Sequence, residues 1–313
     1  MEEKMTKVVI SEFMDESAVD TLRARFDVLY DPKLVDQPAA LLAALAQADG
    51  LIVRNRTQVS ADMLPAAPAL KVVGRLGVGL DNIDVARCKA AGVEVIPATG
   101  ANALAVAEYV IGTAMVLLRG SYLSSSEVAA GEWPRTRMSN GRETAGKTLG
   151  LVGFGGIGQL TARLARGLGM QVVAHDPMIA NDAPVWAESG VTPLALDALV
   201  STADVVSLHV PLTDGTRGLF GAACIQSMKA GAVLINTARG GIVDEAALAA
   251  ALRSGHLGGA ALDVFEAEPL PAGSALAGVP NLILTPHIGG VTFESNERVS
   301  SLIAERVIRF LAD

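Results

Sequence analysis

The stretch LGLVGFGGIG, residues 149–158, decides the fold. An apolar strand leads directly into a G-x-G-x-x-G turn, and an Ala-, Leu- and Arg-rich helical segment follows. Gly153 permits the tight turn, Gly155 lets the backbone approach a pyrophosphate, and Gly158 allows the helix to pack closely on the strand. The N–H groups at the start of the helix would face the phosphates. The stretch predicts a dinucleotide site, with a plain glycine-rich turn as the alternative, and its expected cofactor contacts are Gly153, Gly155, Gly156, Ile157 and Gly158.

A carboxylate follows at the spacing that a ribose-binding residue needs. The next apolar run, Val172 to His175, is followed by Asp176, which lies 18 positions past Gly158. An ionised Asp176 accepts hydrogen bonds from both ribose hydroxyls and repels a 2′-phosphate, so we expect NAD rather than NADP. The alternative is that Asp176 is a turn or cap residue before Pro177.

Short apolar runs alternate with longer helical segments along the whole chain, which is typical of βαβ units. The runs lack polar alternation, so helices should cover both faces of parallel sheets. We therefore expect an α/β fold with two doubly wound parallel-sheet domains, Rossmann-like or flavodoxin-like, and a cleft between them. The expected strands are 8–10, 28–30, 51–53, 72–73 and 93–96 in the first series, and 149–153, 172–175, 205–209, 233–236, 260–263 and 282–285 in the second.

The two series define the expected domains. Residues 101–287 should form the NAD-binding domain, beginning with a helix over 102–119. The last helix, Asn296 to Leu311, comes after the second sheet is complete, so we expect it to return to the first domain. The substrate-binding domain would then be discontinuous and consist of residues 1–100 and 288–313.

Composition limits the classes of protein that the chain can belong to. Its 313 residues carry 25 Lys plus Arg against 33 Asp plus Glu, a net charge of −8, which disfavours nucleic-acid binding. The stretch Ala103 to Leu118 contains Glu108 and is too short for a membrane span, and residues 1–4 do not resemble a signal peptide. The two cysteines lack the spacing of a metal or disulfide site. We expect a cytoplasmic protein without a metal, in which local arginines bind anionic ligands.

Three further segments, 236–241, 263–269 and 285–290, each place a reactive side chain just after an apolar strand. Ligands bind at this end of the strands in open α/β sheets. The side chains are Arg239, Glu268 and His287. Each alone could be structural: a surface ion pair, a loop carboxylate, or a hydrogen-bonded histidine. Their occurrence together after the glycine turn favours catalysis.

In this order of motifs the sequence resembles the D-isomer-specific 2-hydroxyacid dehydrogenases over essentially its whole length. The resemblance implies that Arg239 binds the substrate carboxylate and the C2 oxygen, that His287 is the acid/base, and that Glu268 hydrogen-bonds His287. A histidine suits the role because oxidation of an alcohol releases a proton near neutral pH. The family also implies cofactor contacts from Val78, Val210, Thr237, Ala238, Asp263, Gly289 and Gly290.

The first series of strands resembles the substrate side of the D-3-phosphoglycerate dehydrogenase branch, in a short form without a regulatory domain. The turn from Gly77 to Gly79 would offer N–H groups to the C1 carboxylate. Arginines would meet a second anion at C3, although exposed arginines are often simply solvated. The expected substrate contacts are Arg54, Arg75, Gly77, Val78, Gly79, Asn102 and Arg135.

We therefore expect an NAD-dependent enzyme that transfers hydride between C2 of a small 2-hydroxy or 2-oxo acid and nicotinamide. A three-carbon acid resembling 3-phosphoglycerate is the first candidate substrate. The alternatives are an (S)-3-sulfolactate dehydrogenase, a hydroxypyruvate or glyoxylate reductase, and, from another class, an NAD-sensing scaffold like the corepressors built on this fold. The family also implies a homodimer assembled through the cofactor domain and the segment around Trp133, from which Arg135 could reach the partner.

Overall fold

The computed structural model describes residues 5–312; residues 1–4, examined above for a leader, and residue 313, the end of the expected substrate domain, lie outside the described residues. The chain divides into two compact units. Unit 1 comprises Met1–Asn102 and Val291–Asp313, and unit 2 comprises Ala103–Gly290. Nowhere in residues 5–312 is a helix both long and apolar enough to cross a membrane.

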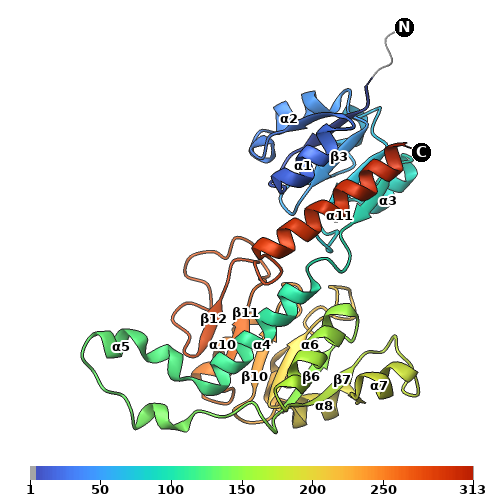
Figure 1. Ribbon diagram of the computed structural model, residues 1–313. Helices are drawn as coiled ribbons and strands as arrows, with labels where there is room; N and C mark the ends of the chain where they lie inside the picture. The colour runs from blue at the N-terminus through green and yellow to red at the C-terminus, as the bar shows by residue number, and fades with distance from the viewer. Residues whose placement is uncertain (1–4, 313) are drawn as a thin grey trace. The chain divides into compact units, whose positions relative to one another are not determined.

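Unit 2, all of whose backbone is described, contains a seven-stranded sheet in which every neighbouring pair is parallel (Figure 1). The order is β12-β11-β10-β9-β6-β7-β8. This order confirms the expected doubly wound sheet. Strand β8 was not predicted from the sequence, because its two residues are too few to form a recognisable pattern. The strands are β6 (Thr148–Val152), β7 (Gln171–His175), β8 (Thr192–Pro193), β9 (Val205–Leu208), β10 (Val233–Asn236), β11 (Gly259–Leu262) and β12 (Leu282–Leu284).

The strand order reverses between β6 and β9. From β6 the chain builds outward to β7 and β8, and then returns to add β9 on the other side of β6. The two strands run parallel with Val152 opposite Leu208, so both end at the same edge of the sheet. Such a reversal is where doubly wound sheets bind ligands.

Helices cover both faces of this sheet because successive strand residues point to opposite sides. Leu149, Leu151 and Val233 pack with α4 and α6 on one face, whereas Val206 and Leu234 pack with α8, α9 and α10 on the other. The helices are α4 (Ala103–Arg119), α6 (Gly156–Gly167), α7 (Pro184–Ser189), α8 (Leu196–Thr202), α9 (Ala222–Ser227) and α10 (Glu245–Arg253).

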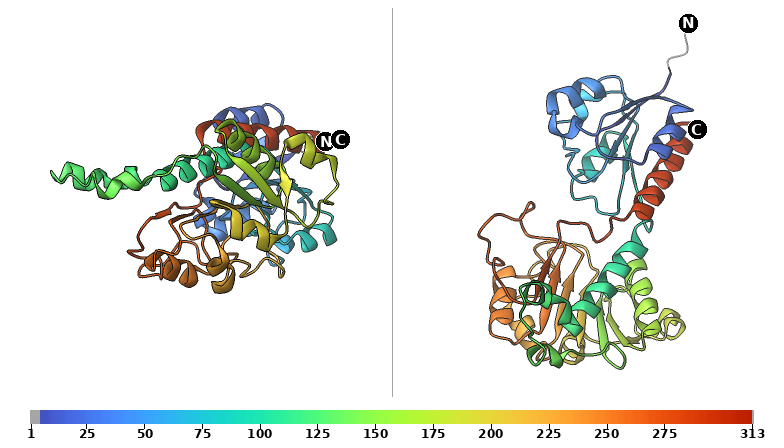
Figure 2. Two further views of the ribbon diagram at one scale, coloured as in Figure 1. Left: turned by 90° about the horizontal axis from the view of Figure 1, so that it is seen from below. Right: turned by 60° about the vertical axis from the view of Figure 1, so that its left-hand side comes forward.

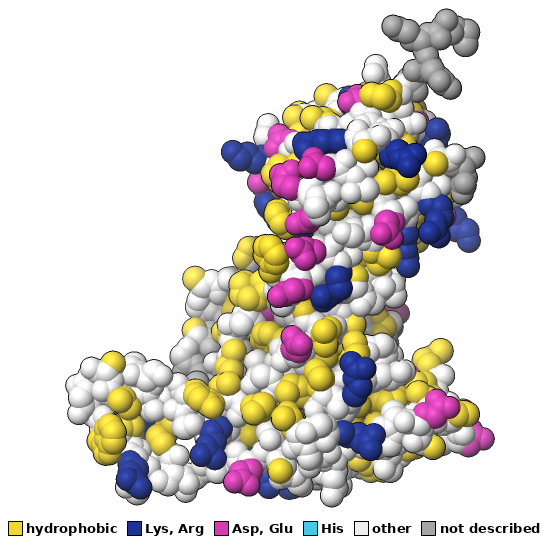
Figure 3. Space-filling view, viewed as in Figure 1, with side chains coloured by type: hydrophobic (Ala, Val, Ile, Leu, Met, Phe, Trp, Pro, Cys, Tyr) yellow, Lys and Arg dark blue, Asp and Glu magenta, His cyan; other side chains and the backbone are white. Residues whose placement is uncertain are grey.

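A segment that we call the arm, residues 120–145, projects from the body of unit 2 in Figure 1 and in the left view of Figure 2. It contains η3 (Ser121–Ser124), α5 (Ser125–Ala129) and η4 (Arg137–Asn140). Two of its aromatic side chains are largely exposed, Tyr122 at 65% and Trp133 at 78%. Apolar side chains are visible on this part of the surface in Figure 3. Such exposure favours an interface with another molecule.

The described part of unit 1 contains a five-stranded parallel sheet in the order β2-β1-β3-β4-β5. This is the flavodoxin-like order, which confirms the second expected sheet. The strands are β1 (Lys7–Ile10), β2 (Asp27–Tyr30), β3 (Gly50–Val53), β4 (Val72–Arg75) and β5 (Glu94–Pro97); the helices are α1 (Glu16–Arg23), η1 (Leu34–Asp36), α2 (Pro38–Leu45), η2 (Leu64–Ala66), α3 (Val85–Ala90) and α11 (Phe293–Ala312).

The C-terminal helix α11 belongs to the core of unit 1. It packs beside α1 and on β4, where a Cβ at Gly74 would lie 2.7 Å from Cγ2 of Ile303 (Figure 1). Real Cβ contacts are not that short, so the glycine is what lets the helix lie flat on the strand. Val8, Ile10 and the α11 residues form one core, and α2 and α3 cover the opposite face.

Candidate active site

The glycine turn after β6 lies against the end of β9. Gly153 has a φ of +97°, and a Cβ there would lie 2.6 Å from the carbonyl oxygen of His209 and 3.0 Å from Cγ1 of Val210. Both the backbone angle and the close approach require glycine. The turn therefore brings Val210, an expected cofactor contact, directly beside the fingerprint.

The next glycines leave space where a cofactor would need it. A Cβ at Gly155 or at Gly156 would meet nothing within 4 Å, so both face open space at the start of α6. A Cβ at Gly158, by contrast, would lie 2.5 Å from the carbonyl oxygen of Gly153, which shows how tightly helix and strand pack. Open backbone at a helix N-terminus is what a pyrophosphate requires, so this turn fits NAD.

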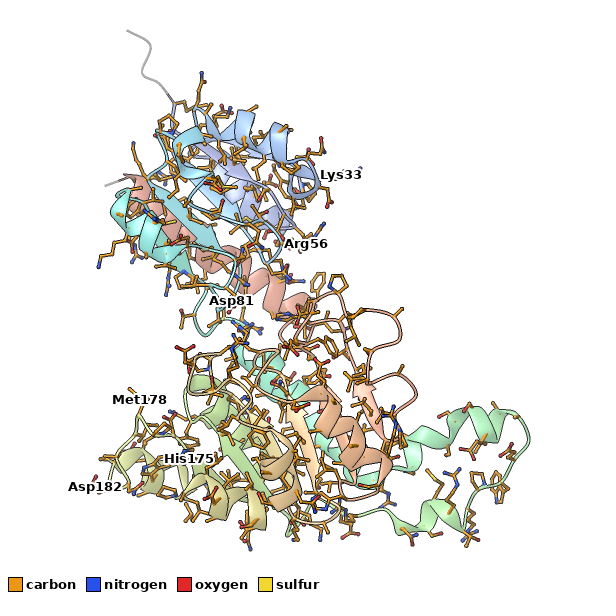
Figure 4. The ribbon with its side chains drawn as sticks, turned by 180° about the vertical axis from the view of Figure 1, so that it is seen from behind. Lys33, Arg56, Asp81, His175, Met178 and Asp182 are labelled. Carbon is orange, nitrogen blue, oxygen red and sulfur yellow. The ribbon has the colours of Figure 1, made fainter. Side chains whose placement is uncertain are left out.

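Asp176 extends this site from the end of β7. Its Oδ2 accepts a hydrogen bond of 2.8 Å from the N–H of Phe154, and its Oδ1 accepts one of 2.9 Å from the N–H of Met178. Figure 4 marks His175, the last residue of β7, and Met178 on the loop beyond. The carboxylate thus holds the fingerprint turn and retains further acceptor capacity for ribose hydroxyls.

The loop after β10 is held by the buried side chain of Asn236. Its Nδ2 donates to the carbonyl oxygen of Arg239 (2.9 Å), and its Oδ1 accepts from the N–H of Ala238 (3.0 Å). Arg239 bonds through Nη1 to the carbonyl oxygen of Ala238 (2.6 Å). Thr237 Oγ1 is buried and has no hydrogen-bond partner among the described residues, as expected of a hydroxyl that awaits a ligand. Asn236 was not predicted as a site residue; it organises the residues that were.

His287 and Glu268 form a hydrogen-bonded pair. Nδ1 of His287 lies 2.8 Å from Oε2 of Glu268, and Oε1 of the same carboxylate accepts from the N–H of Phe265 (3.1 Å). The side chains are 39% and 35% exposed, so the histidine is accessible to a substrate. His287 has a φ of +57°, a left-handed conformation that costs a non-glycine residue about 1–2 kcal/mol. Surrounding contacts must hold it there.

Asp263, which directly follows β11, makes several of the contacts that hold the loop around His287. The carboxylate is buried, and it accepts hydrogen bonds from the N–H groups of Ile288 (2.8 Å) and Gly289 (2.7 Å), the two residues after His287. It also accepts from the hydroxyl of Thr285 (2.6 Å), which in turn bonds Tyr109. Neither Thr285 nor Tyr109 was predicted, because their partners are remote in sequence. Gly290, another expected cofactor contact, follows directly in the same loop.

A second histidine, His209, lies next to the cofactor turn. Nε2 of His209 is 3.0 Å from the hydroxyl oxygen of Ser207, and burial lowers the pKa of His209 to about 4. The ring is therefore neutral at physiological pH.

Unit 1 places its own set of expected residues at the ends of β3, β4 and β5. Arg54 follows β3, donates from Nη2 to Oδ1 of Asn296 (2.8 Å), and lies over the ring of Phe13 at 5.8 Å from its centroid. Burial lowers the pKa of Arg54, an effect that the charge of Glu12 opposes. Glu12 is itself a residue that sequence reasoning missed: its carboxylate accepts from the N–H groups of Arg54, Arg56 and Thr57.

The Arg75 guanidinium folds back over the loop that follows β4. Its Nη1 donates to the carbonyl oxygen of Leu76 (3.2 Å), and a Cβ at Gly77 would lie only 1.5 Å from that nitrogen. Gly77 is therefore the residue that admits the guanidinium beside the Gly77–Gly79 loop. Val78 is 38% exposed on this loop, and Asn102 has a buried Oδ1 without a hydrogen-bond partner among the described residues.

Arg135 belongs to the arm of unit 2. Its N–H donates to the carbonyl oxygen of Trp133 (2.8 Å), its carbonyl oxygen accepts from Ser139, and its side chain is exposed. The fingerprint, Asp176 and the three catalytic candidates thus belong to unit 2, whereas Arg54, Arg75, Gly77 to Gly79 and Asn102 belong to unit 1.

Comparisons with known proteins agree with this geometry. The family model of the D-isomer specific 2-hydroxyacid dehydrogenase NAD binding domain matches residues 111–289. The chain is 55% identical to an (S)-sulfolactate dehydrogenase of Chromohalobacter salexigens, covering 98% of this chain and 99% of the relative. It is 40% identical to a D-3-phosphoglycerate dehydrogenase of Mycobacterium leprae, covering 97% of this chain but only 57% of that relative.

A solved structure extends the likeness to both units. A protein of Thermus thermophilus matches 98% of this chain and 97% of its own, with a TM-score of 0.87 and 35% identity. The matches cover the fingerprint as well as the residues of unit 1, and the matching family model is that of an NAD-binding domain. The chain therefore belongs to the D-isomer specific 2-hydroxyacid dehydrogenase family, and it is an NAD-dependent oxidoreductase that acts on a small hydroxy acid.

Proposed function

We propose that this enzyme is an (S)-3-sulfolactate dehydrogenase, which interconverts (S)-3-sulfolactate and 3-sulfopyruvate with NAD. The observation that carries the reaction is the 2.8 Å hydrogen bond between His287 and Glu268. The observation that favours the substrate is the 55% identity, over nearly the full length of both chains, to a sulfolactate dehydrogenase.

The Glu268 bond determines which nitrogen of His287 can take the substrate proton. A carboxylate oxygen only accepts hydrogen bonds, so Nδ1 carries the hydrogen and Nε2 is left with the free electron pair. Nε2 can then remove the proton from the C2 hydroxyl as the carbonyl forms. The imidazolium that results is stabilised by the Glu268 carboxylate. Positioned bases of this kind contribute about 10²–10⁴ in rate.

Unit 2 would hold NAD through the open turn at Gly155 and Gly156, the Asp176 carboxylate and the buried hydroxyl of Thr237. When bound, the nicotinamide accepts the hydride that leaves C2 of the substrate. The planar guanidinium of Arg239 would hold the C1 carboxylate and the C2 oxygen and so orient the C2 hydrogen.

The second anion of the substrate would be bound by unit 1. Arg54 and Arg75 are two cations held in place by their own contacts, with Asn296 and the Gly77 loop respectively. A sulfonate offers three oxygen acceptors to such donors. The Gly77–Gly79 loop and Asn102 would supply neutral hydrogen bonds to the same substrate.

Stereochemistry agrees with this substrate. In 3-sulfolactate the carbon that bears sulfur ranks above the carboxyl carbon, whereas in lactate and 3-phosphoglycerate the carboxyl carbon ranks higher. The label S in sulfolactate therefore describes the same arrangement at C2 as the label D in the other two acids. A family specific for D-isomers would accept (S)-sulfolactate and reject its enantiomer.

The proposal includes a homodimer in the cytoplasm. The exposed Tyr122 and Trp133 of the arm favour an interface with a second copy, which would also place Arg135 near a partner. The net charge of −8 favours neither nucleic acid nor an anionic membrane as a partner. Light scattering should give twice the chain mass, and Trp133→Ala should weaken the association; a monomeric wild type would contradict the assembly.

The substrate is tested by steady-state assays with NAD or NADH and a panel of acids. The panel comprises both enantiomers of 3-sulfolactate, D-3-phosphoglycerate, D-lactate, glyoxylate and hydroxypyruvate. We expect (S)-3-sulfolactate to give the highest kcat/KM, and a higher value for D-3-phosphoglycerate would overturn the assignment. His287→Asn should lower kcat by about 10²–10⁴ with little change in NADH affinity; unchanged turnover would remove His287 from its role.

A further inference from the structure

We propose that Tyr109 is a positioning residue for His287 and acts on it through Thr285 and Asp263. The inference rests on the proposed function, in which His287 is the acid/base. It concerns a residue of α4, the helix that covers one face of the unit 2 sheet.

A partly buried chain of short hydrogen bonds joins the three side chains. The hydroxyl oxygen of Tyr109 lies 2.6 Å from Oγ1 of Thr285, and Oγ1 of Thr285 lies 2.6 Å from Oδ1 of Asp263. Tyr109 and Thr285 are partly buried, and Asp263 is 1% exposed. All three lie within unit 2.

The carboxylate fixes the direction of every proton in the chain. Because Asp263 can only accept, the hydroxyl hydrogen of Thr285 points to Asp263, and the Tyr109 hydroxyl must donate to Thr285. Hydrogen bonds aligned in one direction strengthen one another in a low-dielectric interior. The Tyr109 hydroxyl therefore strengthens the hydrogen bond that Thr285 donates to Asp263.

The Asp263 carboxylate in turn holds the backbone on the C-terminal side of His287 by two hydrogen bonds. Its Oδ1 accepts from the N–H of Ile288 and its Oδ2 from the N–H of Gly289, at 2.8 and 2.7 Å. On the N-terminal side, the N–H of His287 donates to the carbonyl oxygen of Thr285 (3.0 Å). The left-handed residue that carries the imidazole is thus held by Thr285 on one side and by Asp263 on the other.

Removal of the Tyr109 hydroxyl would remove its hydrogen bond to Thr285 and leave the fold of unit 2 intact. The Thr285 oxygen would lose its hydrogen-bond donor, and without that polarisation its own hydrogen bond to Asp263 would weaken. Asp263 would then hold the loop less firmly, and the His287 ring would sample positions from which it cannot reach the C2 hydroxyl. A displacement of about 1 Å at such a site costs up to a hundredfold in rate.

The test compares Tyr109→Phe with Tyr30→Phe. Tyr30 is a matched control, because its hydroxyl also makes buried hydrogen bonds, to the N–H and carbonyl oxygen of Met14, but in unit 1. We expect Tyr109→Phe to lower kcat on the order of tenfold, while KM and the Kd for NADH stay within about twofold. Tyr30→Phe should leave kcat unchanged.

A spectroscopic readout separates positioning from a general loss of stability. The chain has four histidines, so ring resonances of ¹³C-labelled histidine can be resolved in the enzyme without cofactor, and His287→Asn identifies the His287 signal. We expect this signal to shift or double in Tyr109→Phe and to stay unchanged in Tyr30→Phe. Thr285→Val should lower kcat at least as much as Tyr109→Phe, and the double variant should be no worse than Thr285→Val alone.

Four results would count against the inference. Wild-type kcat in Tyr109→Phe, with His287→Asn inactive, would refute the role of Tyr109 and leave the proposed function intact. A lower kcat with an unchanged His287 signal, or additive losses in the double variant, would show that Tyr109 does not act through Thr285. Full activity of His287→Asn would overturn the proposed function and this inference together.

Discussion

Gly240 and Phe265 lie backbone against backbone: a Cβ at Gly240 would sit 1.7 Å from the carbonyl oxygen of Phe265. Gly240 directly follows Arg239, and the N–H of Phe265 bonds Glu268. The contact therefore joins the loop that carries Arg239 to the loop that carries Glu268, the hydrogen-bond partner of His287. No side chain fits between them.

Gly240→Ala should force these loops apart. We expect a loss of at least about 10² in kcat/KM together with a lower melting temperature, because a methyl group cannot displace backbone atoms at little cost. The matched control is Gly112→Ala in α4, where a Cβ would meet nothing within 4 Å. This substitution should stabilise the helix by up to about 1 kcal/mol. Near-normal kinetics in Gly240→Ala would contradict the proposed rigidity.

Arg75→Ala should weaken the binding only of substrates that carry a second anion, at C3. Loss of a charge-assisted hydrogen bond worth about 1.5–3 kcal/mol predicts a KM for (S)-3-sulfolactate raised by about 10- to 150-fold. D-lactate, which has no anion at C3, should lose much less. Arg25→Ala, an exposed change elsewhere in unit 1, is the control. Equal losses on both acids would show that Arg75 does not contact the C3 group.

Asp176→Ala should weaken NAD binding and reduce the discrimination against NADP. The change removes the proposed ribose acceptor and also the acceptor of the Phe154 N–H, so we expect a Kd for NAD raised by about 10- to 100-fold. The ratio of NADP to NAD turnover should rise, since the repulsion of a 2′-phosphate is gone. The control is Asp182→Ala, because Asp182 is exposed on the loop where Figure 4 labels it. This substitution should change neither the Kd for NAD nor the ratio of NADP to NAD turnover.

His209 should make unit 2 less stable in acid. Burial lowers its pKa from 6.5 to about 4, so between these values the unfolded chain binds a proton that the folded chain does not. As the pH falls from 6.5 to 4, protonation of His209 in the unfolded chain should lower the free energy of unfolding by about 3 kcal/mol. Above pH 6.5, His209 should contribute no pH dependence to the free energy of unfolding.

Urea unfolding at pH 7.5 and pH 5 tests this dependence. Both tryptophans, Trp133 and Trp186, lie in unit 2, and Trp186 stacks on Phe154 of the cofactor turn, so their fluorescence reports on this unit. His209→Gln should lose less stability between the two pH values than the wild type does. An equal loss in both proteins would exclude His209 as the source.

Much of the fold could be predicted because its signals are local. The apolar strand, the glycine turn and the helix of residues 149–158 are contiguous, and their spacing to Asp176 is a property of one βαβ unit. The parallel sheets followed from apolar runs without alternation. A strand of two residues such as β8 carries no such pattern, because its pairing with β7 is decided by the neighbouring strand rather than by its own sequence.

The supporting residues could not be predicted because their partners are far away in the chain. Tyr109 stands in an apolar helix and bonds a threonine 176 positions later, and Glu12 organises backbone 42 to 45 positions later. Composition and periodicity contain no information on such pairs. Arg239, Glu268 and His287 could be proposed from the sequence because each lies in the loop after an apolar strand, at the edge where open α/β sheets bind ligands.

The packing of α11 on Gly74 sets an order for the assembly of the nascent chain. A ribosome releases all of Ala103–Gly290 before it releases Val291 and the residues that follow, so unit 2 can complete its core while the sheet of unit 1 still lacks α11. Until then, the face of β4 that Ile303 and Val307 later cover is open to water and to other chains. Unit 1 is therefore the part of a newly made molecule that most needs protection from aggregation.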